Sequence, residues 1–206
     1  MQISTTANPT PVDDARLAEI LANPGFGQHF TDHMLTVEWT PDNGWHDARV
    51  TPYGPLTLDP ATAVLHYAQE TFEGMKAYRH DDGSIWTFRP EQNAARMVRS
   101  SKRLAFPELP VDDFVACVDA LVEADQRWVP SSEGEKSLYL RPFMFASETF
   151  LGVRPARVKV SDSQRLTGLM PPLKYAPAGE AITMKVTCWA GRTPRNVSEA
   201  NMNGRR

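Results

Sequence analysis

The segment of residues 74–128 constrains the fold most, because it joins a β-hairpin pattern directly to two helical patterns. Two stretches of alternating apolar and polar residues, 74–79 and 84–89, flank the dipeptide Asp82-Gly83. An Asp-Gly pair between alternating stretches is typical of a tight hairpin turn. We therefore expect two antiparallel strands here.

Two helices are predicted after the hairpin. Pro90 suits the first position of a helix, where its missing N–H costs nothing, and this helix should extend to about Leu104. The second helix, 110–128, has acidic residues near its positive end and an apolar stripe on one side. That stripe consists of Phe114, Val118, Leu121 and Val122.

The remaining patterns predict short elements on both sides of this segment. We expect a helix at 13–21 with an Asp cap, strands at 35–39 and 48–53 around a turn, and a helical turn at 61–71. A strand rich in aromatic residues is predicted at 136–146. Strands and helices in this order indicate a two-layer α+β fold, a mostly antiparallel sheet with flanking helices.

Charge and composition exclude several functional classes. The chain has 22 Lys and Arg against 25 Asp and Glu, a formal charge of −3, which gives no general signal for nucleic acid or membrane binding. No stretch approaches the ~20 apolar residues of a membrane helix, and no secretory leader pattern opens the sequence. The two cysteines do not form a disulfide framework. We expect a cytoplasmic protein.

Charge nevertheless changes abruptly along the chain. Residues 1–156 contain 13 basic and 22 acidic residues, whereas residues 157–206 contain 9 basic and 3 acidic residues. We therefore predict a flexible arm at 1–14, a folded domain at 15–156 and an atypical basic tail at 157–206. Within the tail, only 181–189 has a strand pattern.

Several side chains are candidates for binding chemistry. Arg96, Arg99 and Arg103 share one helical face, which is either a solvated basic face or an anion site. Tyr139 and Arg141 alternate with leucines and therefore point to one face of their strand, as a carboxylate clamp or as a structural pair.

Metal and nucleotide sites have weak support. His29 and His33 lie four residues apart, a spacing that could begin a metal site on a helix, but no third cluster of ligands accompanies them. We expect no metal. Neither a glycine-rich nucleotide loop nor a GxSxG nucleophile motif occurs in the sequence.

Five ordered motifs carry a family resemblance. They are FTDHMLTVEW at 30–39, YAQETFEGMKAY at 67–78, NAARMVRS at 93–100, SLYLRPF at 137–143 and LGV at 151–153. In this order they resemble the branched-chain amino-acid aminotransferases, fold-type IV enzymes that use pyridoxal 5′-phosphate. The resemblance covers about residues 15–156 and implies the smaller, N-terminal domain of that family.

The resemblance also implies roles for individual residues. Arg96 matches the arginine that binds the cofactor phosphate, which favours the anion interpretation at this one position. Tyr139 and Arg141 match the pair that organises recognition of the substrate carboxylates. The remaining matches line the substrate pocket: Phe26, Tyr67 and Phe72.

Further implications concern the assembly and the reaction. Residues Leu151, Gly152 and Val153 match a loop that reaches into the neighbouring subunit's pocket, which implies a homodimer. The implied reaction, in branched-chain amino-acid biosynthesis, moves the amino group of leucine, isoleucine or valine to 2-oxoglutarate. Its products are a branched 2-oxo acid and glutamate.

The pattern of the family stops after Ala156. Transamination needs a lysine that holds the cofactor covalently and shuttles a proton, and the family places it in a second domain that we do not find here. Glu199 lies in VSEANMN, which faintly resembles the family's glutamate motif for the pyridine nitrogen. We therefore expect a truncated, inactive chain with half of the cofactor site and no catalytic residue. The alternative is a non-catalytic dimerisation or binding module derived from that enzyme.

Overall fold

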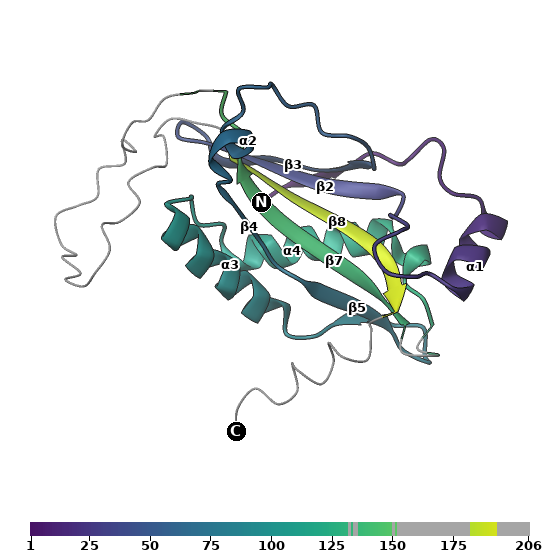
Figure 1. The fold of residues 1–206 in the computed structure, drawn as a ribbon. Helices are drawn as coiled ribbons and strands as arrows, with labels where there is room; N and C mark the ends of the chain where they lie inside the picture. The colour runs from purple at the N-terminus through teal and green to yellow at the C-terminus, as the bar shows by residue number, and fades with distance from the viewer. Residues whose placement is uncertain (132, 134–135, 150, 152–181, 193–206) are drawn as a thin grey trace.

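The computed structural model describes residues 1–131, 133, 136–149, 151 and 182–192. Its helices are α1 (Asp14–Ala22), α2 (Ala63–Tyr67), α3 (Pro90–Leu104), α4 (Val111–Ala124) and the 3-10 turn η1 (Gln126–Trp128). Its strands are β1 (Ile3–Thr5), β2 (His33–Thr40), β3 (Gly44–Pro52), β4 (Glu70–Phe72), β5 (Met75–Arg79), β6 (Ile85–Thr87), β7 (Lys136–Ala146) and β8 (Ile182–Arg192). These elements confirm the α+β prediction (Figure 1).

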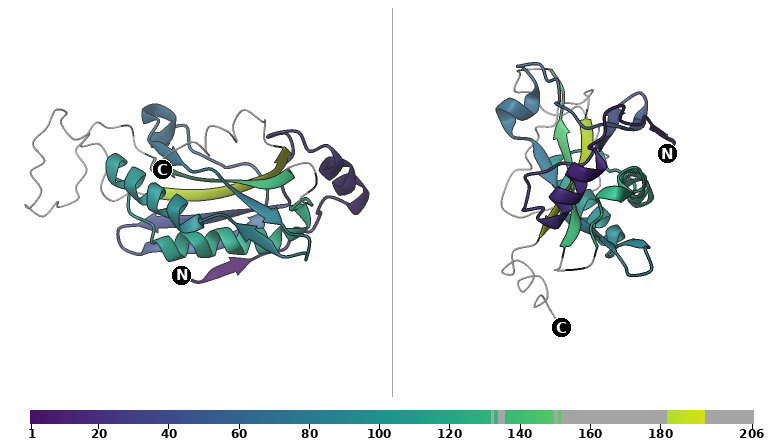
Figure 2. Two further views of the ribbon diagram at one scale, coloured as in Figure 1. Left: turned by 90° about the horizontal axis from the view of Figure 1, so that it is seen from below. Right: turned by 90° about the vertical axis from the view of Figure 1, so that its right-hand side faces the viewer.

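The described strands form one twisted sheet. Their order is β1-β3-β2-β8-β7-β5-β6, and β4 pairs with β7 beside β5. All pairs are antiparallel except β1 with β3. Helices α3 and α4 cover one face of this sheet, whereas α2 and the segment after β3 lie on the other face, here called the open face (Figure 2).

Alternation along β7 separates the core from the open face. Leu138, Leu140 and Met144 are fully buried and belong to the core formed with the helices. Tyr139 and Arg141 lie between them and are half-buried on the open face. This arrangement follows from the period of two in a strand, as the sequence predicts.

Pro142 explains why the strand beside β7 is interrupted. Proline has no N–H, so it cannot donate a ladder hydrogen bond. On this side of β7, β4 pairs with residues 143–145 and β5 with residues 138–140. The residues that join β4 to β5 turn opposite Pro142, whose carbonyl accepts the Glu73 N–H at 2.8 Å.

The strand predicted at 181–189 is confirmed and lies in the middle of the sheet. β8 pairs with β7 along all of Lys136–Ala146 and with β2 on its other side. Its residues Met184, Val186 and Cys188 are fully buried in the core. The described sheet therefore includes eleven residues of the segment that the sequence assigns to the tail.

The N-terminal segment, predicted to be a flexible arm, has regular structure from Ile3 to Thr5. β1 lies parallel to β3, and the amide N–H of Asn8 donates to Nε2 of His33 at 2.9 Å. Asp13 caps α1, as expected, by accepting from the Arg16 N–H. Among the described residues, no helix is both long and apolar enough to span a bilayer.

Candidate substrate- and cofactor-binding site

Tyr139 and Arg141 form a pair on the open face. A guanidinium N–H of Arg141 donates to the hydroxyl of Tyr139 at 3.1 Å, and its Cζ lies 5.3 Å from the centroid of the Tyr139 ring. Because the phenol holds one side of the guanidinium, the plane of the cation is fixed in an orientation that an anionic partner can meet. The geometry therefore fits a carboxylate clamp.

Two phenylalanines frame this pair. The ring of Phe72 lies under Arg141, with Cζ 4.4 Å from the ring centroid. Phe26 meets Tyr139 edge to face, with the centroids 5.9 Å apart. Both phenylalanines are about half exposed. A charged group bordered by aromatic walls suits a ligand that has a carboxylate and an apolar side chain.

Gly74 leaves room for Tyr139. A Cβ built on Gly74 would lie 2.3 Å from the Tyr139 hydroxyl oxygen, which is far inside a van der Waals contact. The position of the phenol therefore requires a glycine here. Sequence reasoning placed Gly74 in a motif without assigning it a role, although a glycine that opens a strand beside an aromatic strand is a usable signal.

Arg96 lies on α3 and reaches the same β4–β5 connection. Its Nε and one Nη donate to the two carboxylate oxygens of Glu73 at 3.1 and 2.7 Å, and this hydrogen bonding raises the pKa of Arg96. Asn93 donates from Nδ2 to Glu73 and to the Gly74 carbonyl, both at 3.0 Å. About half of the Arg96 side chain remains exposed, whereas Glu73 is buried. Sequence reasoning missed Glu73 and Asn93, although both stand in the quoted motifs.

The remaining predicted site residues that the structure describes form no hydrogen bond or ring contact with the Tyr139–Arg141 pair or with Arg96. Tyr67 ends α2 and is 48% exposed, and Leu151, which follows β7 in the chain, is 56% exposed. Gly152, Val153 and Glu199 lie outside the described residues. Their predicted roles stay predictions.

Lys185 is the buried cation of the open face. It stands between Phe143 and Thr36 in the sheet register, is 3% exposed, and has Nζ 5.9 Å from the ring centroid of Tyr53. Burial lowers the pKa of its ammonium group. No carboxylate among the described residues forms an ion pair with it.

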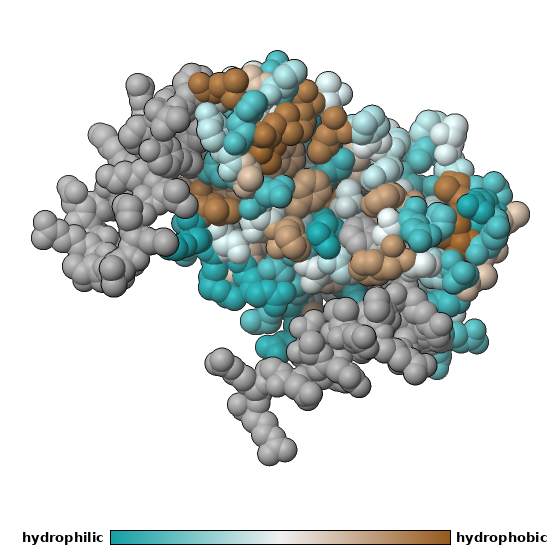
Figure 3. All heavy atoms as spheres, in the orientation of Figure 1, coloured by the Kyte–Doolittle hydropathy of each residue, from teal (hydrophilic) through white to brown (hydrophobic). Residues whose placement is uncertain are grey.

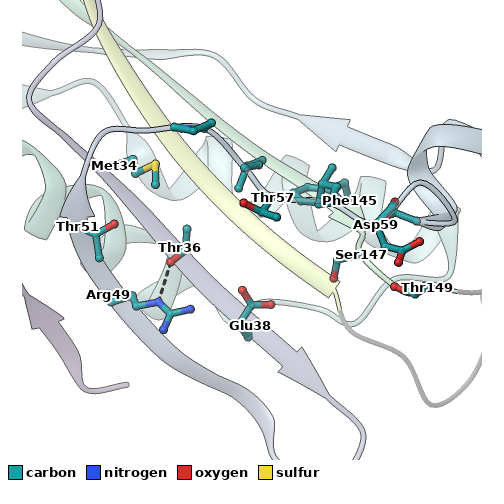
Figure 4. Close-up of a pocket in the computed structure, with 14 residues that line it drawn as sticks. Met34, Thr36, Glu38, Arg49, Thr51, Thr57, Asp59, Phe145, Ser147 and Thr149 are labelled. Atoms are coloured by element: carbon teal, nitrogen blue, oxygen red, sulfur yellow. Dashed lines mark hydrogen bonds between the residues drawn. The ribbon is translucent and has the colours of Figure 1, made fainter.

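A pocket lies on the β2–β3 side of the open face (Figure 4). It has a volume of about 410 Å³ and lies between β2, β3 and residues 55–59, with Phe145 on its wall. The guanidinium of Arg49, on its wall, already has protein partners: it donates to Thr36 at 3.3 Å and forms an ion pair with Asp47. The pocket contains none of the predicted site residues.

His33 has a structural role in place of the metal chemistry considered for it. It begins strand β2, so the helical spacing to His29 does not apply. Its Nδ1 lies 2.7 Å from the buried carboxylate of Asp125, and its Nε2 accepts from Asn8. Burial raises the pKa of Asp125 above its usual value. No cluster of three metal-binding side chains occurs in the part of the chain that is described.

Comparison with curated proteins gives close relatives. A probable branched-chain-amino-acid aminotransferase of Streptomyces coelicolor is 65% identical over 146 residues, which cover 71% of this chain and 40% of that protein. The branched-chain-amino-acid aminotransferase of Mycolicibacterium smegmatis is 55% identical over 156 residues, 76% of this chain and 42% of that protein. Over this matched part, the chain is similar to the branched-chain-amino-acid aminotransferases. It spans about 40% of the length of these curated relatives.

Solved structures of branched-chain aminotransferases match a similar share of this chain, but with lower sequence identity. The Escherichia coli enzyme is 17% identical with a TM-score of 0.49, covering 75% of this chain and 40% of that one. The enzyme of Thermoproteus uzoniensis, solved with norvaline, is 17% identical with a TM-score of 0.48, covering 76% of this chain and 40% of that one. No protein-family model matches the chain. The resemblance read from the five sequence motifs is confirmed by the curated relatives.

Proposed function

We propose that this chain carries the substrate-recognition half of a pyridoxal-phosphate-dependent branched-chain transaminase acting in the cytoplasm. The reaction moves the amino group of leucine, isoleucine or valine to 2-oxoglutarate. The observation that carries the proposal is the Tyr139–Arg141 pair between the rings of Phe26 and Phe72. The high identity to enzymes named for this activity supports it.

The side chains divide the recognition of a branched substrate between them. Arg141 binds the carboxylate through its guanidinium, while Tyr139 fixes the plane of that group. Phe26 and Phe72 exclude water from the aliphatic side chain and stabilise it by burial, at roughly 25 cal/mol per Å² of apolar surface. A substrate with a short polar side chain would lack this contribution.

The chain also fits the phosphate end of the cofactor. Arg96 has a half-exposed guanidinium whose far edge is anchored by Glu73, so its outer N–H groups can meet a phosphate. When bound, pyridoxal phosphate supplies the electron sink for transamination. We assign no lysine of this chain to the covalent attachment. We therefore propose that the 206-residue polypeptide by itself binds but does not turn over its substrates.

Binding by the substrate half can be tested by NMR titration of the purified chain with 4-methyl-2-oxopentanoate. We expect saturable shifts at Arg141, Phe26 and Phe72, and their loss in Arg141→Met. The matched control is Arg49→Met, which removes a guanidinium from the pocket on the β2–β3 side of the open face. Equal shifts in both variants would exclude Arg141 as the carboxylate ligand, and turnover of leucine by the chain alone would overturn the proposed inactivity.

A second candidate function is a non-catalytic association module, a homodimer or a pair with a full-length family member. It is favoured by the apolar side chains on the open face (Figure 3). They include Phe26 and Phe72 beside the Tyr139–Arg141 pair, and Leu65 and Tyr67 on α2, which are 48–60% exposed. Size-exclusion chromatography of the chain with a complete branched-chain-amino-acid aminotransferase tests it, and separate elution of the two proteins would count against it.

A further inference from the structure

Three consecutive residues, the last of β4 and the two that join it to β5, each contact a different part of the site. Phe72 lies under the guanidinium of Arg141. Glu73 binds Arg96 with both carboxylate oxygens. Gly74 faces the hydroxyl of Tyr139 with no room for a side chain. The backbone of this tripeptide therefore connects the anion-binding arginine on α3 to the clamp on β7.

The Glu73 carboxylate accepts three hydrogen bonds. Two come from Arg96 and one from Asn93, at distances of 2.7 to 3.1 Å. The carboxylate is 7% exposed, so these donors replace the water that an ionised group requires. Its own N–H is fixed on the Pro142 carbonyl. The side chain and the backbone of Glu73 are thus held from different directions.

We infer that Glu73 is a positioning residue: it fixes the Arg96 guanidinium for a phosphate and holds it in register with the Tyr139–Arg141 clamp. The inference rests on the proposed function for its ligand. Glu73 itself touches no ligand, because its carboxylate lies behind Arg96 and is covered. Its effect passes through Arg96 on one side and through the Phe72–Gly74 backbone on the other.

For the substitution Glu73→Gln, the change in charge and the loss of positioning predict opposite effects on phosphate binding. Glu73→Gln leaves the shape almost unchanged and makes the site one unit more positive, so charge alone predicts tighter binding of a phosphate. An amide, however, has only one acceptor oxygen, and its NH₂ group would face a donor of Arg96 or Asn93. The bidentate pair must then open. Positioning therefore predicts weaker binding.

The first experiment needs no ligand. Arginine side-chain ¹H–¹⁵N NMR of the full chain reports Nε–H order and exchange at Arg96 and Arg141 separately. In Glu73→Gln we expect faster exchange at Arg96 and a shifted Arg141 signal. The matched control is Glu91→Gln, which removes the same charge from the exposed first turn of α3. An unchanged Arg96 signal in Glu73→Gln would overturn the inference.

The second experiment measures binding of pyridoxal 5′-phosphate, with inorganic phosphate and phosphate-free pyridoxal for comparison. We expect Glu73→Gln to bind the phosphate compounds about tenfold more weakly than wild type, and Glu91→Gln to bind them equally. Glu73→Asp, which keeps the charge but shortens the reach, should also bind weakly. Equal or tighter binding by Glu73→Gln would show that charge alone governs the site.

The two proposals fail in different ways. If wild type binds no phosphate compound while Glu73→Gln still loosens Arg96, the cofactor role of Arg96 is wrong and the positioning of its side chain stands. If wild type binds and both Glu73 variants match it, the proposed function stands and the positioning role is wrong. Thermal unfolding of each variant separates these outcomes from loss of the fold.

Discussion

Gly74 and Tyr139 occupy one space, because the hydroxyl of Tyr139 lies where a Cβ of residue 74 would be. We predict that Gly74→Ala lowers the free energy of unfolding by about 1–3 kcal/mol, the usual cost of overpacking. It should also displace Tyr139 from Arg141. Urea unfolding and the Arg141 side-chain NMR signal measure the two effects. Gly54→Ala is the control, since nothing lies within 4 Å of its Cβ position, and an equal effect there would contradict the steric explanation.

Cys117 predicts a pH dependence of stability. Desolvation raises the pKa of this buried thiol to about 12 from its usual 9.0. Between these values the unfolded chain loses the proton while the folded chain keeps it, so stability falls as the pH rises. The slope is at most about 1.4 kcal/mol per pH unit. Urea unfolding of wild type and Cys117→Ala at about pH 8, 9 and 10 should show a steeper decline for wild type. Parallel curves would mean that Cys117 does not titrate in this way.

Strand β8 carries the main prediction at the scale of elements. It lies between β2 and β7 and places three buried side chains in the core, so its removal leaves two unpaired strand edges. We predict that a chain of residues 1–156 loses cooperative urea unfolding, monitored by tryptophan fluorescence. A chain of residues 1–192 is the control and should unfold as the full chain does. Cooperative unfolding of residues 1–156 at the full-chain midpoint would show that the sheet does not need β8.

The elements that could be predicted are those with strong local signals. The helix at 90–104 has the predicted bounds, and Pro90 is the signal that marks its start. The hairpin follows from the turn dipeptide Asp82-Gly83. The pairing of Tyr139 with Arg141 on one face of β7 could be predicted because both alternate with leucines on one strand. The Glu73–Arg96 pair could not be predicted in this way. The position of Glu73 is set by the hydrogen bond from its N–H to the carbonyl of Pro142, a residue far along the chain. The place of β8 and the tie between Asn8 and His33 likewise depend on long-range contacts.

At the scale of the molecule, the two faces of the sheet differ in cover. Helices α3 and α4 bury one face, whereas the open face has the short helix α2 and the segment after β3 (Figure 2). Two of its exposed apolar residues, Phe26 and Phe72, contact the Tyr139–Arg141 pair, so the surface proposed to bind a substrate would also bury area on association. Apolar patches of several hundred Å² on a soluble protein mark such contacts.

We therefore predict concentration-dependent self-association of the chain through the open face. The double substitution Leu65→Ser and Phe72→Ser removes two side chains that are 58% and 60% exposed, so it should weaken association with little effect on the unfolding midpoint. Sedimentation velocity over a concentration series measures the change. Phe88→Ser is the control, because Phe88 is 74% exposed but lies between β6 and α3, outside the group around the clamp. A monomer at every concentration, or equal weakening by Phe88→Ser, would show that exposure on the open face does not drive assembly.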